Sequence, residues 1–174
     1  MRKHRIKTSG HDIDDLLMKG QHHLYDYHID AHGNWFCEGN PVVDEELFRI
    51  LSRSLFEQQG RYFIHCEGEI HPVRVADAPL WVRYVHLRIS PEGHLQAVDI
   101  ELRDGRREPL AADTLSVAHN QGLYCRATRH GLKARFGKVA YYEFTRHLHM
   151  DPSGATFYFI IADQRYDVRP ELPH

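Results

Sequence analysis

The chain has 174 residues, of which 42% are hydrophobic and 26% charged, and its formal net charge is −2 with histidine neutral. This composition is typical of a globular protein of one domain or two small ones, rather than a disordered chain. The balanced charge lacks the basic excess of nucleic-acid-binding domains, so no nucleic acid is expected as a partner. No apolar run approaches the roughly 18 residues of a membrane span, so no membrane association is expected either.

The cysteines indicate a reducing compartment. There are three, Cys37, Cys66 and Cys125, and their odd number and wide spacing argue against a disulfide framework. The first residues lack the hydrophobic core of a signal peptide. Together these features predict a cytoplasmic protein.

The first third of the chain is predicted to combine a hairpin with a helix. Residues 11–19 have apolar positions at helical spacing and predict a short helix. Alternation predicts strands over 24–30 and 35–37, joined by a His-Gly-Asn turn. The clearest helix is predicted over 44–58, after a proline. Its expected buried stripe consists of Leu47, Ile50, Leu51 and Leu55.

The rest of the chain is predicted to consist mostly of strands around a second helix. Strands are expected over 61–66, 70–75, 81–89, 94–103, 107–110, 115–118 and 123–127. Side chains at steps of four predict the second helix over 132–148, with Phe136, Ala140, Phe144 and Leu148 on one face. A closing hairpin is expected from 156–161 and 166–168.

The two predicted helices lie in similar surroundings. Each follows a His-Gly turn and precedes a glycine, an aromatic strand and a hairpin. We therefore expect an α+β fold of two repeated units, each mainly antiparallel β-sheet with one main helix. The expected organisation is an N-terminal segment with a short helix (1–24), a first α+β repeat (25–80), a β-meander connector (81–118) and a second α+β repeat (119–170).

Three motifs connect the chain to a known family. Residues 30–42 read D-A-H-G-N-W-F-C-E-G-N-P-V, residues 75–79 read V-A-D-A-P, and residues 129–135 read R-H-G-L-K-A-R before Y-Y-E at 141–143. In sequence and order these resemble the D-G-T-W-F-Y-E-G-x-P-I, V-E-D-A-P-F and R-G-G-L-x-A-R motifs of the DUF1285 family of bacterial proteins. The departures from the motifs are Ala31, His32, Cys37, Ala76 and Leu80.

The resemblance implies a divergent DUF1285 protein with an α+β fold and repeated structural motifs. It implies no established activity and assigns no functional residue, because the function of the family is unknown. A role in bacterial signal transduction or ligand sensing has been considered for such proteins, and the resemblance suggests the same role for this chain.

Histidine is the unusual feature of the composition, with fifteen residues. Zinc or another divalent metal would need about four converging ligands. The metal-ligand candidates are His28, Asp30, His65 and His71. His28 and Asp30 are two positions apart and could share a strand face. No spacing of a known zinc site occurs, however, so histidines that bind no metal are the favoured interpretation.

The candidates for ligand binding are Trp35, Glu38 and Asp77. Trp35 belongs to an aromatic pair between turns and could line a cleft, although core packing is favoured. Asp77 could hold a ligand or cap backbone amides. Cys37, with His32 across the turn, could be a reactive thiol, but a cysteine that packs as a small hydrophobic residue is favoured.

No motif of a common catalytic site occurs, so no catalytic residue is predicted. We expect a non-enzymatic ligand-binding or regulatory protein whose partner is a small ligand or another protein. Two alternatives stay open. One is a metal-dependent enzyme that uses some of the histidines, and the other is a homo-oligomeric interaction protein joined through open sheet edges.

Overall fold

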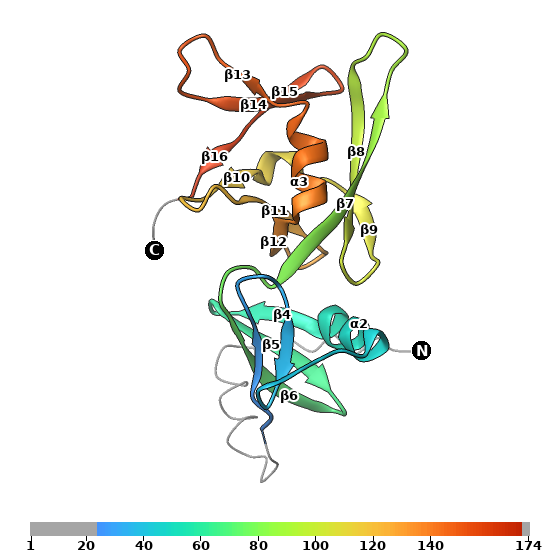
Figure 1. Ribbon diagram of the computed structural model, residues 1–174, viewed down its shortest axis with the longest axis vertical. Helices are drawn as coiled ribbons and strands as arrows, with labels where there is room; N and C mark the ends of the chain where they lie inside the picture. The colour runs from blue at the N-terminus through green and yellow to red at the C-terminus, as the bar shows by residue number, and fades with distance from the viewer. Residues whose placement is uncertain (1–23, 172–174) are drawn as a thin grey trace, which may run out of the picture. The chain divides into compact units, whose positions relative to one another are not determined.

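The computed structural model describes residues 24–171 and has a mixed α+β fold (Figure 1). Within this range it has two α-helices, and its sixteen strands lie in three sheets. The chain divides into two compact units with the boundary between Asp77 and Ala78. Neither helix in the described range is long and apolar enough to cross a lipid bilayer. The helix expected over 11–19 lies outside the described residues.

The first unit is a six-stranded sheet with the strand order β3-β2-β1-β6-β5-β4. Its strands are β1 (Tyr27–Ile29), β2 (Trp35–Cys37), β3 (Asn40–Pro41), β4 (Leu55–Gln58), β5 (Arg61–Cys66) and β6 (Glu69–Val75). β1 lies antiparallel to β2 and parallel to β6. Tyr27 and Ile29 are buried on either side of the half-exposed His28, because side chains alternate along a strand.

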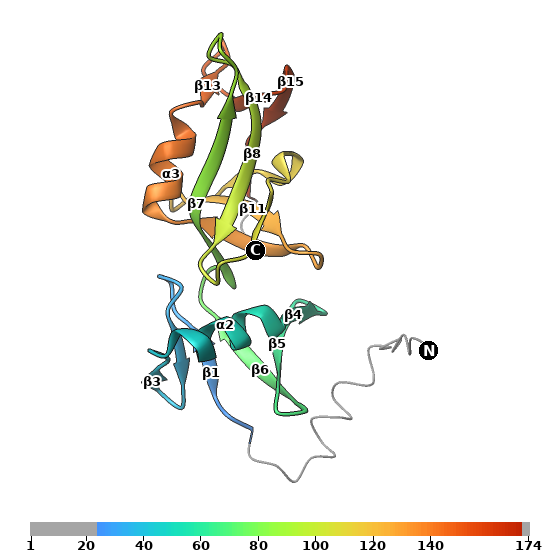
Figure 2. The same cartoon turned by 90° about the vertical axis from the view of Figure 1, so that its right-hand side faces the viewer.

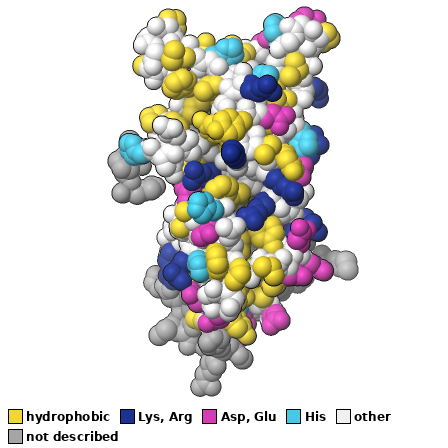
Figure 3. Space-filling model, viewed as in Figure 1, with side chains coloured by type: hydrophobic (Ala, Val, Ile, Leu, Met, Phe, Trp, Pro, Cys, Tyr) yellow, Lys and Arg dark blue, Asp and Glu magenta, His cyan; other side chains and the backbone are white. Residues whose placement is uncertain are grey.

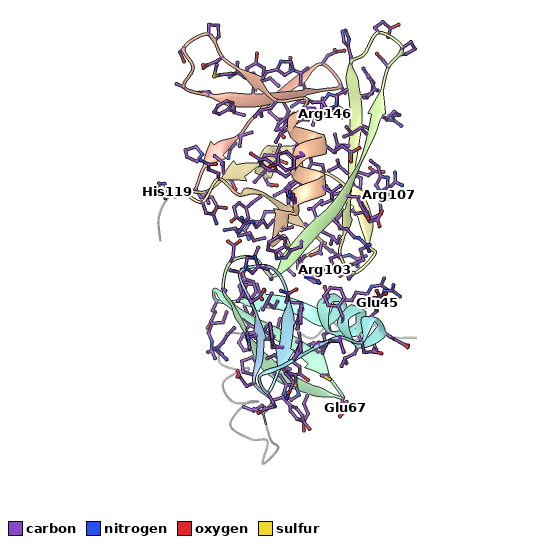
Figure 4. The ribbon with its side chains drawn as sticks, viewed as in Figure 1. Glu45, Glu67, Arg103, Arg107, His119 and Arg146 are labelled. Atoms are coloured by element: carbon purple, nitrogen blue, oxygen red, sulfur yellow. The ribbon has the colours of Figure 1, made fainter. Side chains whose placement is uncertain are left out.

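Helix α2 (Glu45–Ser54) precedes β4. It begins at Asp44, whose carboxylate accepts a hydrogen bond of 2.7 Å from the amide of Leu47. Glu45, labelled in Figure 4, forms an ion pair with Arg49, four residues further along the helix, at 3.2 Å.

The helix predicted over 44–58 is too long, and half of its expected buried stripe is wrong. Leu51 and Leu55 are buried, but Leu47 is 42% exposed and Ile50 is 54% exposed. Leu55 has extended backbone angles and begins β4, which pairs with β5. The Gln59-Gly60 turn has positive φ at both residues, which favours a tight hairpin over a continued helix.

The second unit contains a seven-stranded sheet with the order β16-β10-β11-β12-β7-β8-β9. Its strands are β7 (Leu80–Ile89), β8 (Leu95–Leu102), β9 (Arg107–Pro109), β10 (Ser116–Val117), β11 (Leu123–Ala127), β12 (Leu132–Phe136) and β16 (Arg169–Pro170). A short 3-10 helix, η1 (Ala112–Thr114), follows β9. The meander expected as a connector is continuous with this sheet, since β7 pairs with β12.

β7 and β8 form the long hairpin seen in Figure 2. A Ser-Pro-Glu-Gly turn closes it with a hydrogen bond of 2.9 Å from the amide of Gly93 to the carbonyl of Ser90. Val98, Ile100 and Leu102 of β8 are buried, as their alternation predicts. Ile89 is 47% exposed and lies beside a register shift at the end of the hairpin.

The helix predicted over 132–148 is wrong in its first part. Leu132–Phe136 is strand β12, in which Leu132, Ala134 and Phe136 are buried at alternate positions. Apolar residues four positions apart lie on one face of a strand as well as on one face of a helix. The shorter helix α3 (Lys138–Thr145) follows, with Gly137 as its N-cap. Ala140 and Phe144 both lie on the buried side of the helix, as predicted.

A third, three-stranded sheet ends the second unit. It consists of β13 (His149–Met150), β14 (Phe157–Ile161) and β15 (Gln164–Asp167), in that order. The rings of Phe144 on α3 and Phe159 on β14 stack at 4.0 Å, and Phe136 stacks on Phe144 at 5.6 Å. These buried rings join the third sheet and α3 to the larger sheet.

Candidate functional site

A cavity of about 330 Å³ lies in the second unit, between β8, η1 and the β14–β15 hairpin. It is lined by Val98, Leu110, Ala111, Ala112, Asp113, Ile161, Gln164 and Tyr166. The volume is at the lower end of the roughly 300–1,000 Å³ typical of small-molecule sites. The cavity is therefore large enough for a small organic ligand.

Backbone hydrogen bonds hold the lining segments together. The amide of Leu110 donates to the carbonyl of Val98 at 2.9 Å, which places the approach to η1 beside β8. The hydroxyl of Thr114 donates to the carbonyl of Ala111 at 2.6 Å and closes the turn of η1. The other wall is fixed where the amide of Ala162 donates to the carbonyl of Leu95 at 2.9 Å.

Five of the eight lining residues are apolar, but the surface that they expose to the cavity is about equally polar and apolar, with one negative charge. Of the lining residues, all within 24–171, Asp113 is the charged one, and Gln164 and Tyr166 add an amide and a phenol. Asp113 and Gln164 are exposed, while Tyr166 is half-buried. A few polar groups on an apolar surface are the usual way in which a pocket orients a small molecule.

Sequence reasoning missed this cavity. Its walls come from three separate stretches, namely β8, residues 110–113 and the β14–β15 hairpin. None of these stretches contains a motif, and the cavity exists because the hairpin folds back on β8 through the Ala162–Leu95 hydrogen bond. No local pattern encodes that long-range contact.

The three predicted ligand-binding residues lie in the first unit and apart from this cavity. Trp35 is 3% exposed, so its indole belongs to the core. Glu38 is exposed, and its carboxylate accepts a hydrogen bond of 2.7 Å from the amide of Asp26, which ties the turn after β2 to the start of β1. Asp77 is half-buried at the end of the first unit.

The four metal-ligand candidates are not brought together. Within residues 24–171, no three His, Cys, Asp or Glu side chains are grouped so that they could hold a metal ion. His28 stacks on Phe36 at 4.5 Å, and the exposed His65 stacks on Phe56 at 5.0 Å. His71 is 2% exposed and packs against the ring of Tyr27 at 5.7 Å.

Asp30, the fourth metal-ligand candidate, organises the turn between β1 and β2. Its carboxylate accepts hydrogen bonds from the amides of His32 and Asn34 at 2.8 and 2.9 Å and from the Asn34 side chain at 3.0 Å. Burial alone would raise the pKa of Asp30, but the hydrogen bonds from Asn34 and His32 lower it below its usual value. The arrangement is an Asx turn.

The cysteines are free thiols. Burial raises the pKa of Cys125 to about 12, so this thiol is held in its unreactive, protonated form. Cys37 and Cys66 are half-buried and adjoin the phenol of Tyr27. Burial, with the contribution of these two thiols, raises the pKa of Tyr27 well above its usual value.

The fold defines a mixed α+β protein built mainly of antiparallel strands, and two solved structures share it. One is a DUF1285 family protein from Silicibacter pomeroyi DSS-3, with a TM-score of 0.69 and 17% identity over 84% of this chain and 80% of that chain. The other is a DUF1285 family protein from Shewanella baltica OS155, with a TM-score of 0.57 and 21% identity over 69% of this chain and 90% of that chain.

The resemblance to the DUF1285 family is thereby confirmed at the level of the fold. No protein-family model and no curated protein matches the sequence.

Proposed function

We propose that the chain is a non-enzymatic ligand-binding protein whose site is the cavity between β8, η1 and the β14–β15 hairpin. The observation that supports the proposal is the lining itself, a surface of suitable volume that is about half apolar and half polar and includes a carboxylate, an amide and a phenol. The apolar residues would remove the body of a ligand from water, while the polar groups would orient it.

The charge of the lining defines the class of ligand. Asp113 would attract a cation and repel an anion, and the Tyr166 phenol can donate or accept a hydrogen bond. The ligand is therefore a small organic ammonium compound with an apolar body. Asp113 is exposed, so its attraction is weakened by water and salt, and the apolar contacts supply most of the affinity.

Ligand-observed NMR with benzylamine and benzoate tests this proposal, because the two probes share a ring but differ in the sign of their charge. Benzylamine should bind more tightly than benzoate, and Asp113→Asn should reduce the affinity for benzylamine by about two- to fivefold. Asp163→Asn is the matched control, since Asp163 lies in the neighbouring turn but outside the lining. Equal binding of both probes to wild-type protein would contradict the assigned ligand class.

The biological setting belongs to the same proposal. The resemblance and the shared fold support a divergent DUF1285 protein with a regulatory role, for which bacterial signal transduction is the suggestion. The free thiols support the cytoplasm as its location. The alternative is a metal-dependent enzyme. Elemental analysis of untagged protein tests it, because such an enzyme would retain about one equivalent of metal.

We further propose that the two units derive from one repeated motif. In the first unit the hairpin β1–β2 precedes α2 and the meander β4–β5–β6, and in the second the hairpin β11–β12 precedes α3 and the meander β13–β14–β15. The units differ in how the meander is attached, because β6 pairs with β1 whereas β13–β15 form their own sheet. The boundaries predicted from the sequence after residues 24, 80 and 118 are part of this proposal, as the limits of the two repeats and the segment between them.

A further inference from the structure

Helix α2 has one apolar side, part of which is buried and part of which is exposed. Leu51 and Leu55 point into the core of the first unit and are 1% and 3% exposed. Val43, Leu47 and Ile50 are 83%, 42% and 54% exposed. Leu47 and Ile50 lie three residues apart on one side of the helix, and Val43 lies in the segment before the N-cap Asp44. We call these three residues the outer stripe.

The charges beside the outer stripe change sign along the helix. Asp44, Glu45 and Glu46 lie at its N-terminal end, Arg49 lies near its middle, and Arg53 lies in its last turn. Glu46 and Arg53 are seven residues apart, so they lie two turns apart on the same side of the stripe. Figure 3 shows the hydrophobic side chains of the first unit among acidic ones on the face in view.

This pattern is self-complementary for an antiparallel pair of helices. A twofold axis near Leu47 and Ile50 would bring each Leu47 against Ile50 of the other copy. The same axis would place each Glu46 near Arg53 of the other copy, while a parallel pair would place like charges side by side. The opposed helix dipoles favour the antiparallel arrangement further.

We propose that the outer stripe of α2 is an interaction surface for a second copy of this chain, in a twofold antiparallel dimer. The proposal is independent of the ligand site in the second unit. A face of three apolar side chains is small compared with the roughly 1,200–2,000 Å² of stable interfaces. We therefore expect a weak, reversible dimer with a dissociation constant in the high micromolar range.

Sedimentation velocity of the full chain over a concentration series tests the proposal. Wild-type protein should shift from monomer towards dimer, and Leu47→Glu with Ile50→Glu should raise the dissociation constant by at least about tenfold. The matched control is Val139→Glu with Tyr142→Glu, on the exposed side of α3, where the residues are 57% and 62% exposed. This control should leave the dissociation constant unchanged.

Charge reversal tests the orientation of the pair. Glu46→Arg alone should weaken the dimer, because it would place two arginines together, and the combination of Glu46→Arg with Arg53→Glu should restore it. Thermal unfolding of each variant confirms that it is folded. A wild-type chain that stays monomeric over the series, or a double reversal that fails to restore the dimer, would overturn the proposal. Loss of folding in the Leu47→Glu and Ile50→Glu variant would instead show that the stripe is covered within one chain.

Discussion

Individual polar residues in the 30–42 stretch serve the turns rather than a ligand. The Asp30 carboxylate accepts three hydrogen bonds from His32 and Asn34, and the Glu38 carboxylate accepts one from the amide of Asp26. The sequence predicts turns at these positions from their glycines and Asx residues. It does not reveal which groups donate hydrogen bonds to each carboxylate, because the Glu38 contact spans twelve residues.

Asp30 makes stability depend on pH. Because the pKa of Asp30 is lowered in the folded state, its charged form contributes stability that is fully present above the unfolded pKa of about 3.9. That contribution is lost as the pH falls through the lower folded pKa. Asp30→Asn keeps a hydrogen-bond acceptor but loses the charge. In urea unfolding, the wild-type protein should be the more stable at about pH 6, and its advantage should shrink towards about pH 2. A constant difference between the two proteins at all pH values would contradict this account.

At the scale of elements, the sequence predicts most strands and misjudges the helices. Strong alternation and turn chemistry locate β5, β6 and β8 well, because each has a buried face and a tight turn. Both helices are shorter than expected. Leu55 and Phe136 have spacings that fit a helix, but pairing of β4 with β5 and of β12 with β11 draws their segments into sheets. These are tertiary contacts, which override local periodicity.

The rings of Phe144 on α3 and Phe159 on β14 stack in the core of the second unit. Phe159 is fully buried against Phe144, whereas Phe157, two residues away on the same strand, is 44% exposed. Phe159→Ala should therefore reduce the free energy of unfolding by about 3–5 kcal/mol, and Phe157→Ala by less than about 1 kcal/mol. Urea unfolding at equilibrium measures both. Similar losses in the two variants would mean that the ring stack contributes no special stability.

At the scale of the whole molecule, each unit has a core of its own. Ile29, Leu51 and Ile64 are buried in the first unit, and Ile100 and Phe144 are buried in the second. The candidate cavity and the outer stripe lie in different units. Composition alone allows one domain or two, and the division becomes visible because the contacts on either side of Asp77 are mainly internal.

Because each unit has its own core, a core substitution in one unit should leave hydrogen exchange in the other unit unchanged. In the Phe159→Ala variant, amide hydrogen exchange should speed up in β12, α3 and β14, which pack around the missing ring. Protection in β5 and β6 of the first unit should stay close to that of wild-type protein. A matching loss of protection in both units would show that they unfold as one cooperative body.

The cavity of the second unit is the centre of the functional account, and amide chemical-shift mapping with benzylamine tests it most directly. The account predicts that the shifts concentrate in residues 110–113 and 161–166, and that Asp113→Asn weakens them while Asp163→Asn does not. Shifts confined to residues 24–77, or no saturable shift at millimolar benzylamine, would contradict the assignment of this cavity as the binding site.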